Sequence, residues 1–133
     1  MAKRKLILTN RPLNAGGLLL ITNVEDTETG ELHIVQYISK GKFKILSKNN
    51  NILFYEEYIS HPNTYSKYRH FKGKEYSVIG IVTDDNNNEY VLYQALYGEN
   101  KCYIRPIDMF LSETDKVKYP EATQKYRFEY IQK

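Results

Sequence analysis

Apolar side chains recur at every second position along most of this 133-residue chain, which is the spacing of β-strands. No window of eleven or more residues shows a clean helical stripe, although residues 62–68 suit a single helical turn. Polar or glycine-containing segments separate the alternating runs and suit hairpin turns. We therefore predict an all-β fold with strands at residues 5–9, 18–26, 31–39, 43–46, 52–59, 75–84, 89–97, 101–105, 111–117 and 126–131.

The predicted strand at residues 89–97 has apolar side chains on both of its faces. One face carries Val91, Tyr93, Ala95 and Tyr97, and the other carries Tyr90, Leu92, Gln94 and Leu96. A strand with only one buried face would alternate apolar and polar residues instead. We therefore predict that this strand lies at the centre of a sheet.

The segment at residues 60–64 divides the chain into two predicted units. Residues 1–60 form an N-terminal β-meander, and residues 65–133 form a small SH3-like barrel or meander; the two units either share one core or pack closely. A shift of 58 positions superposes four pairs of identical residues: Val24 and Val82, Asp26 and Asp84, Glu31 and Glu89, and Gln36 and Gln94. Two interpretations stay open, namely an internal duplication and a chance similarity between two meanders.

The composition is that of an ordinary folded domain, with 41% hydrophobic and 26% charged residues. No run approaches the roughly 20 apolar residues that a membrane-spanning helix needs. The N-terminal Lys3-Arg4-Lys5 precedes only three apolar residues, too few for a signal peptide. The single cysteine, Cys102, excludes an internal disulfide and fits a reducing compartment. We therefore expect a cytoplasmic protein, and a net charge of +3 that permits an anionic partner without requiring one.

The sequence lacks the residue groupings that catalysis needs. The three histidines have no metal-ligand spacing with one another or with Cys102. The acidic pairs at residues 56–57 and 84–85 are adjacent, so on a strand their carboxylates point to opposite faces. No nucleophile elbow or phosphate-binding glycine loop is present. We predict that the protein is not an enzyme and has neither a metal site nor a cofactor.

An ordered series of motifs in the second half carries a family resemblance. Residues 68–76 read YRHFKGKEY, residues 91–98 read VLYQALYG, and IRP, DMF and RF follow at 104–106, 108–110 and 127–128. In order and spacing these motifs resemble the bacterial and phage family called domain of unknown function 1653, over about residues 65–131. The resemblance implies a small β-rich domain with no assigned activity.

The apolar members of these motifs are expected to be structural. Gly73 follows Phe71 in a tight turn that needs a positive φ, and Phe71 anchors that turn in the core. Ile107, Met109 and Phe110 are expected to close one end of the barrel, because large apolar residues beside strands usually fill cores.

The polar members come from three separated segments, each beside an apolar anchor. If the barrel closes, His70 and Arg105 lie near one another, and tyrosines including Tyr103 add aromatic walls. Arginine suits a phosphate or carboxylate, and tyrosine rings stack on nucleobases. The predicted ligand-binding residues are Tyr68, His70, Lys72, Tyr97, Arg105 and Arg127. In the alternative interpretation, Arg105 and Arg127 hold the terminal strand by pairing with Asp108, Glu113 or Glu129.

These observations predict a non-catalytic protein that recognises an anionic ligand, either a nucleotide-type small molecule or a nucleic acid. Unrelated phage proteins of similar size capture nucleotide signals of host immunity, so we expect a phage-encoded sponge that counters host defence. The alternative is a protein–protein inhibitor or adaptor that blocks a host protein, because tyrosine and arginine dominate interface hot spots. No membrane partner is expected. An unpaired edge strand at residues 5–9 can join two copies into a homodimer.

Overall fold

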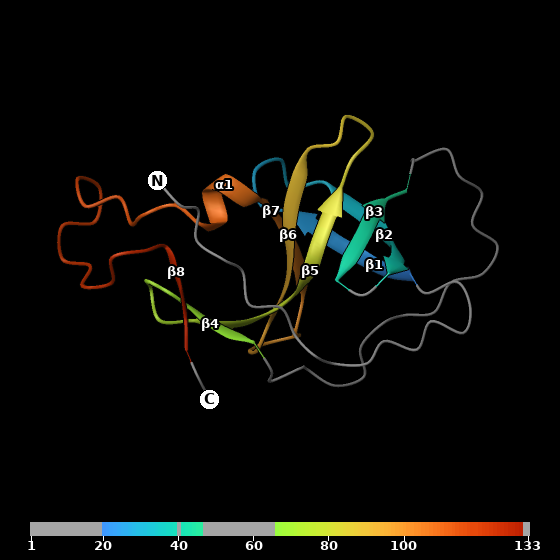
Figure 1. Cartoon of the computed structure of the whole chain (residues 1–133). Helices are drawn as coiled ribbons and strands as arrows, with labels where there is room; N and C mark the ends of the chain where they lie inside the picture. Colours follow the sequence, from blue (N-terminus) through green and yellow to red (C-terminus); the bar gives the residue numbers. More distant parts are fainter. Residues whose placement is uncertain (1–19, 40, 47–65, 132–133) are drawn as a thin grey trace.

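The computed structural model describes residues 20–39, 41–46 and 66–131 (Figure 1). The predicted strands at 5–9 and 52–59 and the boundary at 60–64 lie outside these residues. No described helix is long and apolar enough to cross a membrane. The described elements follow in the order β1 (Leu20–Asp26), β2 (Leu32–Ser39), β3 (Lys42–Ile45), β4 (Lys67–His70), β5 (Glu75–Thr83), β6 (Glu89–Ala95), β7 (Cys102–Pro106), α1 (Ile107–Phe110) and β8 (Phe128–Tyr130). The predicted all-β class is confirmed.

Six of the described strands close into a β-barrel (Figure 1). They follow one another in the order β3-β2-β1-β7-β6-β5, and a parallel pairing of β3 with β5 closes the ring. A second parallel pairing joins β1 to β7. The barrel therefore takes three strands from each half of the chain. The SH3-like topology and the internal duplication stay predictions.

Strands β5 and β6 of the barrel bury side chains on both of their faces. The barrel interior is filled from all six strands, by Ile21, Val24, Val35, Phe43, Ile79, Val82, Leu92, Cys102 and Ile104. A second group, here called the outer cluster, joins the outside of β5 and β6 to β4, α1 and β8; it contains Tyr68, Val78, Val91, Tyr93, Phe110 and Phe128. Strand β6 pairs with β5 and β7 and contributes to both groups, so its predicted central position is confirmed.

Strand β5 has a bulge at the point where β3 meets it. The register of β5 against β6 shifts between Val78 and Gly80, and such a bulge bends a strand. The backbone N–H of Ile81 donates to the carbonyl oxygen of Gly41 at 2.9 Å. A Cβ at Gly80 would lie 2.7 Å from that same oxygen and 2.9 Å from Cε1 of Phe43. Glycine at position 80 therefore permits the close approach that closes the barrel.

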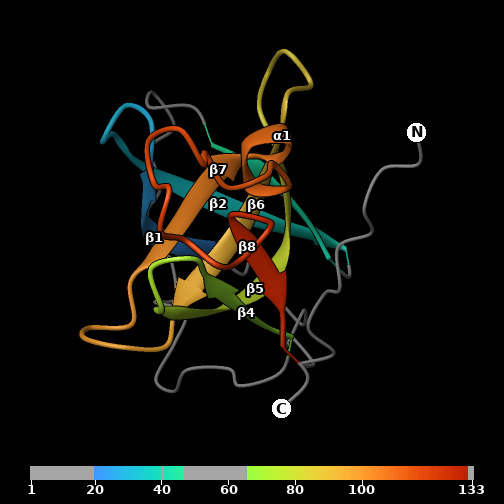
Figure 2. The same cartoon turned by 90° about the vertical axis from the view of Figure 1, so that its left-hand side faces the viewer.

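Two predicted elements were wrong. Residues 111–117 form no strand, only an isolated bridge between Glu113 and Tyr126. The Asp115 carboxylate accepts hydrogen bonds from the backbone N–H groups of Val117 and Lys118, which turns the chain away from an extended path. The predicted helical turn at 62–68 is wrong over residues 66–68, the part that the structure describes. Strand β4 begins at Lys67 and pairs with both β5 and β8 (Figure 2).

Helix α1 has a different position from the one expected for residues 107–110. Phe110 is completely buried, but it belongs to the outer cluster rather than to the barrel interior. Ile107 packs against the same cluster. The short helix therefore covers the outside of the barrel wall and does not plug an end of the barrel.

Candidate functional site

Phe128 on β8 lies at the centre of the candidate site, in contact with residues from several elements. It is 1% exposed, and its ring stacks on Phe110 with the ring centroids 4.1 Å apart. The rings of His70 and Tyr93 approach it edge-to-face at 4.9 and 5.5 Å. The guanidinium carbon of Arg105 lies 5.6 Å from its centroid. One buried ring thus brings together residues from β4, β6, β7, α1 and β8.

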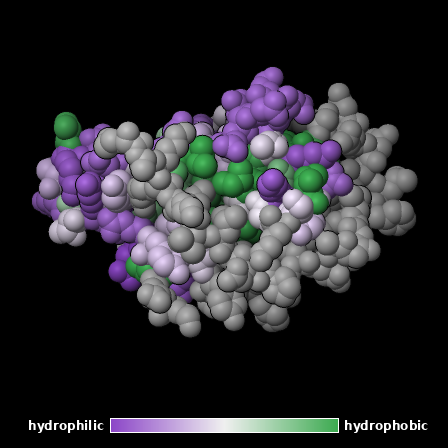
Figure 3. Space-filling model, in the orientation of Figure 1, coloured by the Kyte–Doolittle hydropathy of each residue, from purple (hydrophilic) through white to green (hydrophobic). Residues whose placement is uncertain are grey.

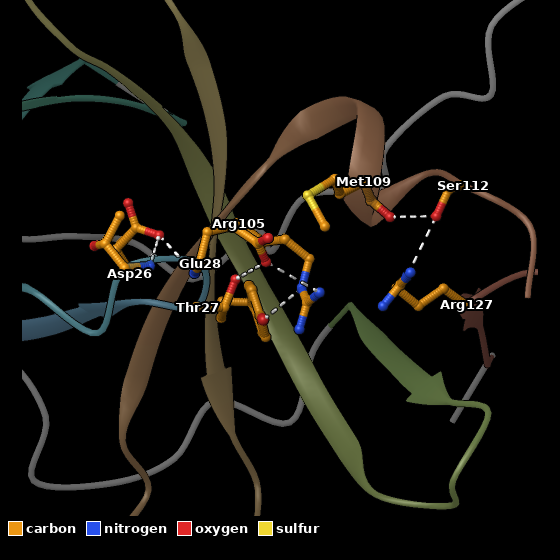
Figure 4. A network of polar contacts seen from close by, with 9 residues as sticks. Asp26, Thr27, Glu28, Arg105, Met109, Ser112 and Arg127 are labelled. Atoms are coloured by element: carbon orange, nitrogen blue, oxygen red, sulfur yellow. Dashed lines mark hydrogen bonds and ion pairs between the residues drawn. The ribbon is translucent and has the colours of Figure 1, made fainter. Parts of the chain in front are cut away.

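Arg105 lies on the face of β7 that is directed toward the outer cluster, opposite to buried Ile104. Its Nε donates a hydrogen bond to Oη of Tyr93 at 3.2 Å, and its side chain is only 15% exposed. Its Nη1 lies 3.9 Å from Oε2 of Glu28 (Figure 4). An ion pair of this length neutralises the guanidinium only in part. The alternative pairing with Asp108 is not found among the described residues.

Arg127 lies directly before β8 and is fixed by Ser112. Its Nε donates to Oγ of Ser112 at 3.3 Å, and this hydroxyl donates to the carbonyl oxygen of Met109 at 2.6 Å (Figure 4). Within the part of the chain that the structure describes, no carboxylate forms an ion pair with Arg127. Glu129, one alternative partner, instead accepts a hydrogen bond from the backbone N–H of Tyr126. The positive charge of Arg127 therefore has no described carboxylate counterpart.

His70 at the end of β4 is held in its neutral form. Its Nδ1 accepts a hydrogen bond from the backbone N–H of Lys72 at 3.1 Å, so Nε2 carries the ring proton. Burial lowers the pKa of His70 from 6.5 to about 4, helped by the charges of Arg105, Arg127 and Lys72. The predicted proximity of His70 to Arg105 is thus present, and Arg127 also lies close enough to act on the imidazole. At neutral pH the positive charge belongs to the cationic side chains around the imidazole.

This environment predicts a pH-dependent stability that is specific to His70. Between pH 4 and 6.5 the unfolded chain binds the His70 proton more readily than the folded protein. The stabilising contribution is therefore complete above pH 6.5 and declines as the pH falls toward 4. We expect His70→Gln to unfold with a shallower pH dependence than the wild type in urea titrations across this range. His33→Gln is the control, and an NMR titration that places the pKa of His70 near 6.5 would contradict the prediction.

The two predicted tyrosines have different surroundings. Tyr68 is 1% exposed and packs edge-to-face against Phe110 and Tyr130, so its ring lies inside the outer cluster and presents no surface to a ligand. Tyr97 is half-buried; its Oη lies 2.7 Å from Oη of Tyr76, and Nζ of Lys74 is 4.6 Å from its ring centroid. Of the two, only Tyr97 remains a candidate wall for a ligand.

Lys72 lies at the outer end of a row of aromatic rings. The ring centroids of His70 and Phe71 are 4.4 Å apart, and those of Phe71 and Tyr119 are 4.8 Å apart. The ammonium group of Lys72 lies 5.0 Å from the centroid of Tyr119. Gly73 has the predicted positive φ, at 104°. Half-buried Phe71 anchors this turn, and the row extends the site from the arginines toward the surface.

Sequence reasoning missed four residues that shape the site: Glu28, Tyr93, Ser112 and Tyr119. Tyr93 stands in the VLYQALYG motif on the same face as Val91, so its burial could have been foreseen. Glu28 comes from the hairpin between β1 and β2, and only the parallel pairing of β1 with β7 brings it near Arg105. No local pattern in the sequence predicts such a contact.

Two chemical properties of the described residues bear on what the site can do. Burial raises the pKa of the Cys102 thiol to about 12, so this group is protonated at neutral pH and is a poor nucleophile. Within residues 20–39, 41–46 and 66–131, no group of three or more His, Cys, Asp or Glu side chains can hold a metal ion. The arrangement presents guanidinium donors and aromatic surfaces.

Residues 66–130, from β4 to β8, match the family described as Protein of unknown function (DUF1653). This segment is a DUF1653 domain. The resemblance seen in the sequence is thereby confirmed, and the family description assigns no catalytic activity. Comparisons with curated proteins and with solved structures found no match.

The DUF1653 domain of this chain completes its barrel with strands that precede it. Strand β5 pairs with β3, and β7 pairs with β1. The domain contains His70, Arg105 and Arg127, whereas Glu28 lies before it. The segment outside the family match therefore supplies the described carboxylate that pairs with Arg105 of the DUF1653 domain.

Proposed function

We propose that this protein is a non-catalytic binding protein that holds an anionic ligand at Arg105 and Arg127. The observation that carries the proposal is an excess of partly buried positive charge. Both guanidinium groups lower the pKa of His70. Among the described residues, the two arginines have one carboxylate partner between them, Glu28, whose Oε2 lies 3.9 Å from Nη1 of Arg105. Charge removed from water without a close counterion is costly. A bound anion would supply the missing negative charge.

The ligand class is a phosphate-bearing molecule of nucleotide type, either small or part of a nucleic acid. Arginine binds phosphate through paired, planar donors, and the neutral His70 adds an Nε2–H donor beside them. Phe71, Tyr97 and Tyr119 are half-buried aromatic side chains around this site, and such rings stack on nucleobases. We place this activity in the cytoplasm, where such a protein would act by sequestering its ligand, as a phage-encoded sponge against host defence would do.

The test is a thermal shift and fluorescence titration with three probes, namely inorganic phosphate, ATP and a ten-nucleotide oligothymidylate. We expect ATP or the oligonucleotide to raise the melting temperature of the wild type, and Arg127→Gln to weaken that binding by about tenfold or more, as loss of a charged hydrogen bond does. Arg69→Gln is the matched control, because Arg69 is exposed and paired with Glu75. Equal loss in both variants, or no shift with any probe, would contradict the proposal.

A second candidate is the protein–protein inhibitor or adaptor. The observation that favours it is the loop between Glu113 and Tyr126, which extends from the body of the structure (Figure 1) and presents Val117 with 94% exposure. Three backbone carbonyls, those of Arg69, Tyr126 and Arg127, hold the Gln124 side chain and so fix the base of this loop. An adaptor would ignore all three anionic probes, and Val117→Asp would abolish its complex with a host protein.

A further inference from the structure

An open cavity lies on the side of the fold formed by the β5–β6 hairpin and the start of α1. It measures about 400 Å³ and is lined by residues 87–90 on one side and 106–108 on the other. Tyr90 and Pro106 are paired in the β6–β7 ladder, so the two walls are direct neighbours. The polar hairpin beside it forms the upper edge of the surface in Figure 3. This volume is within the usual range for a small-ligand pocket.

Among the residues that the structure describes, the cavity lining has acidic and amide side chains and no basic ones. Glu89 and Asp108 place one carboxylate on each wall, and Asn87 and Asn88 add carboxamides. Neither Glu89 nor Asp108 forms an ion pair within the described ranges of the chain. Tyr90 and residues 106–107 supply the apolar part of the lining. The electrostatic character is therefore opposite to that of the arginine site.

The hairpin wall of the cavity is fixed before any ligand binds. The Asp84 carboxylate accepts hydrogen bonds from the backbone N–H of Asn86 and Asn88, both at 2.9 Å, and from Nδ2 of Asn88 at 3.0 Å. The hydroxyl of Tyr90 donates to the same carboxylate at 3.2 Å. Asn87 takes a positive φ of 63° between them. One side chain thus sets the positions of the amides and of the tyrosine ring, which reduces the ordering cost of binding.

We infer that this cavity binds an organic cation that carries a guanidinium or ammonium group. Glu89 and Asp108 accept charge-assisted hydrogen bonds from such a group, and the ring of Tyr90 offers a cation–π surface and an apolar contact for its carbon chain. The described lining residues include no lysine, arginine or histidine, so they offer no positively charged donor for an anion. The cation is either a free amine or a basic side chain of a polypeptide.

The test is an NMR titration of the full chain with three probes: agmatine, spermidine and N-acetylarginine amide. We expect shift changes at the backbone amides of residues 87–90 and 107–108, with an affinity about tenfold weaker in both Asp108→Asn and Glu89→Gln. Glu99→Gln is the matched control, since it removes an exposed carboxylate at the opposite end of β6. Stronger binding of agmatine or spermidine indicates a free amine, and stronger binding of the arginine amide indicates a polypeptide side chain.

Three results would overturn the inference. They are shift changes elsewhere on the surface, an equal weakening in Glu99→Gln, and an absence of shifts with all probes up to 50-fold the protein concentration or about 10 mM. The arginine site does not contribute to this cavity, so Arg127→Gln should bind these cations as the wild type does. A failure of the anion proposal and a failure of this inference are therefore distinguishable.

Discussion

Phe128→Ala is expected to lower the free energy of unfolding by about 3–5 kcal/mol, the range for truncating a buried phenylalanine. The ring is 1% exposed and stacked on Phe110 at 4.1 Å. It also meets His70 and Tyr93, and it lies under the guanidinium of Arg105. Its removal leaves a cavity in the outer cluster and loosens the packing of β8 on the outside of the barrel, so that β8 is held chiefly by its pairing with β4. This is the largest loss of stability that we expect from a single side chain.

The measurement is urea denaturation followed by circular dichroism, with Tyr130→Ala as the control on the same strand. Tyr130 is 45% exposed, so its truncation should cost less than half as much. Phe128→Leu keeps most of the buried apolar area and should give an intermediate loss. If Phe128→Ala unfolds within about 1 kcal/mol of the wild type, the ring is not the centre of a packed cluster. Arg105 and His70 would then need another explanation for their proximity.

Local patterns predicted the middle of the fold well. The alternation of residues along β5, β6 and β7 is a property of neighbouring positions, and hairpin turns connect these strands in sequence order. Apolar side chains on both faces of β6 required two packed layers, and the structure has them. The same local reasoning selected His70, Arg105 and Arg127, because each stands beside an apolar residue that fixes its position.

Local sequence patterns could not predict contacts between segments that lie far apart in the chain. The parallel pairing of β3 with β5 joins residues about 40 positions apart, and no turn residue signals it. Residues 111–117 were predicted as a strand, but the Asp115 carboxylate competes for the backbone N–H groups and makes a turn. Tyr68 has a polar hydroxyl and was assigned to a surface, yet tertiary packing buries its ring.

Gly80→Ala is expected to destabilise the protein by about 1–3 kcal/mol, the cost of overpacking a closely packed site. The added Cβ would lie 2.7 Å from the carbonyl oxygen of Gly41, a backbone atom that cannot rotate away. That oxygen also accepts the hydrogen bond from Ile81 that joins β3 to β5. The backbone must move to relieve the clash, so the pairing that closes the barrel should weaken first.

We expect the weakened pairing in Gly80→Ala to appear as faster amide hydrogen exchange at Ile81, together with a lower midpoint of urea unfolding. Gly30→Asn is the control, because a Cβ at Gly30 meets nothing within 4 Å and asparagine tolerates its positive φ of 76°. Unchanged protection at Ile81 would mean that β3 and β5 do not approach so closely. Since β3 precedes the DUF1653 domain, faster exchange would also indicate that the preceding segment closes the barrel of that domain through its pairing with β5.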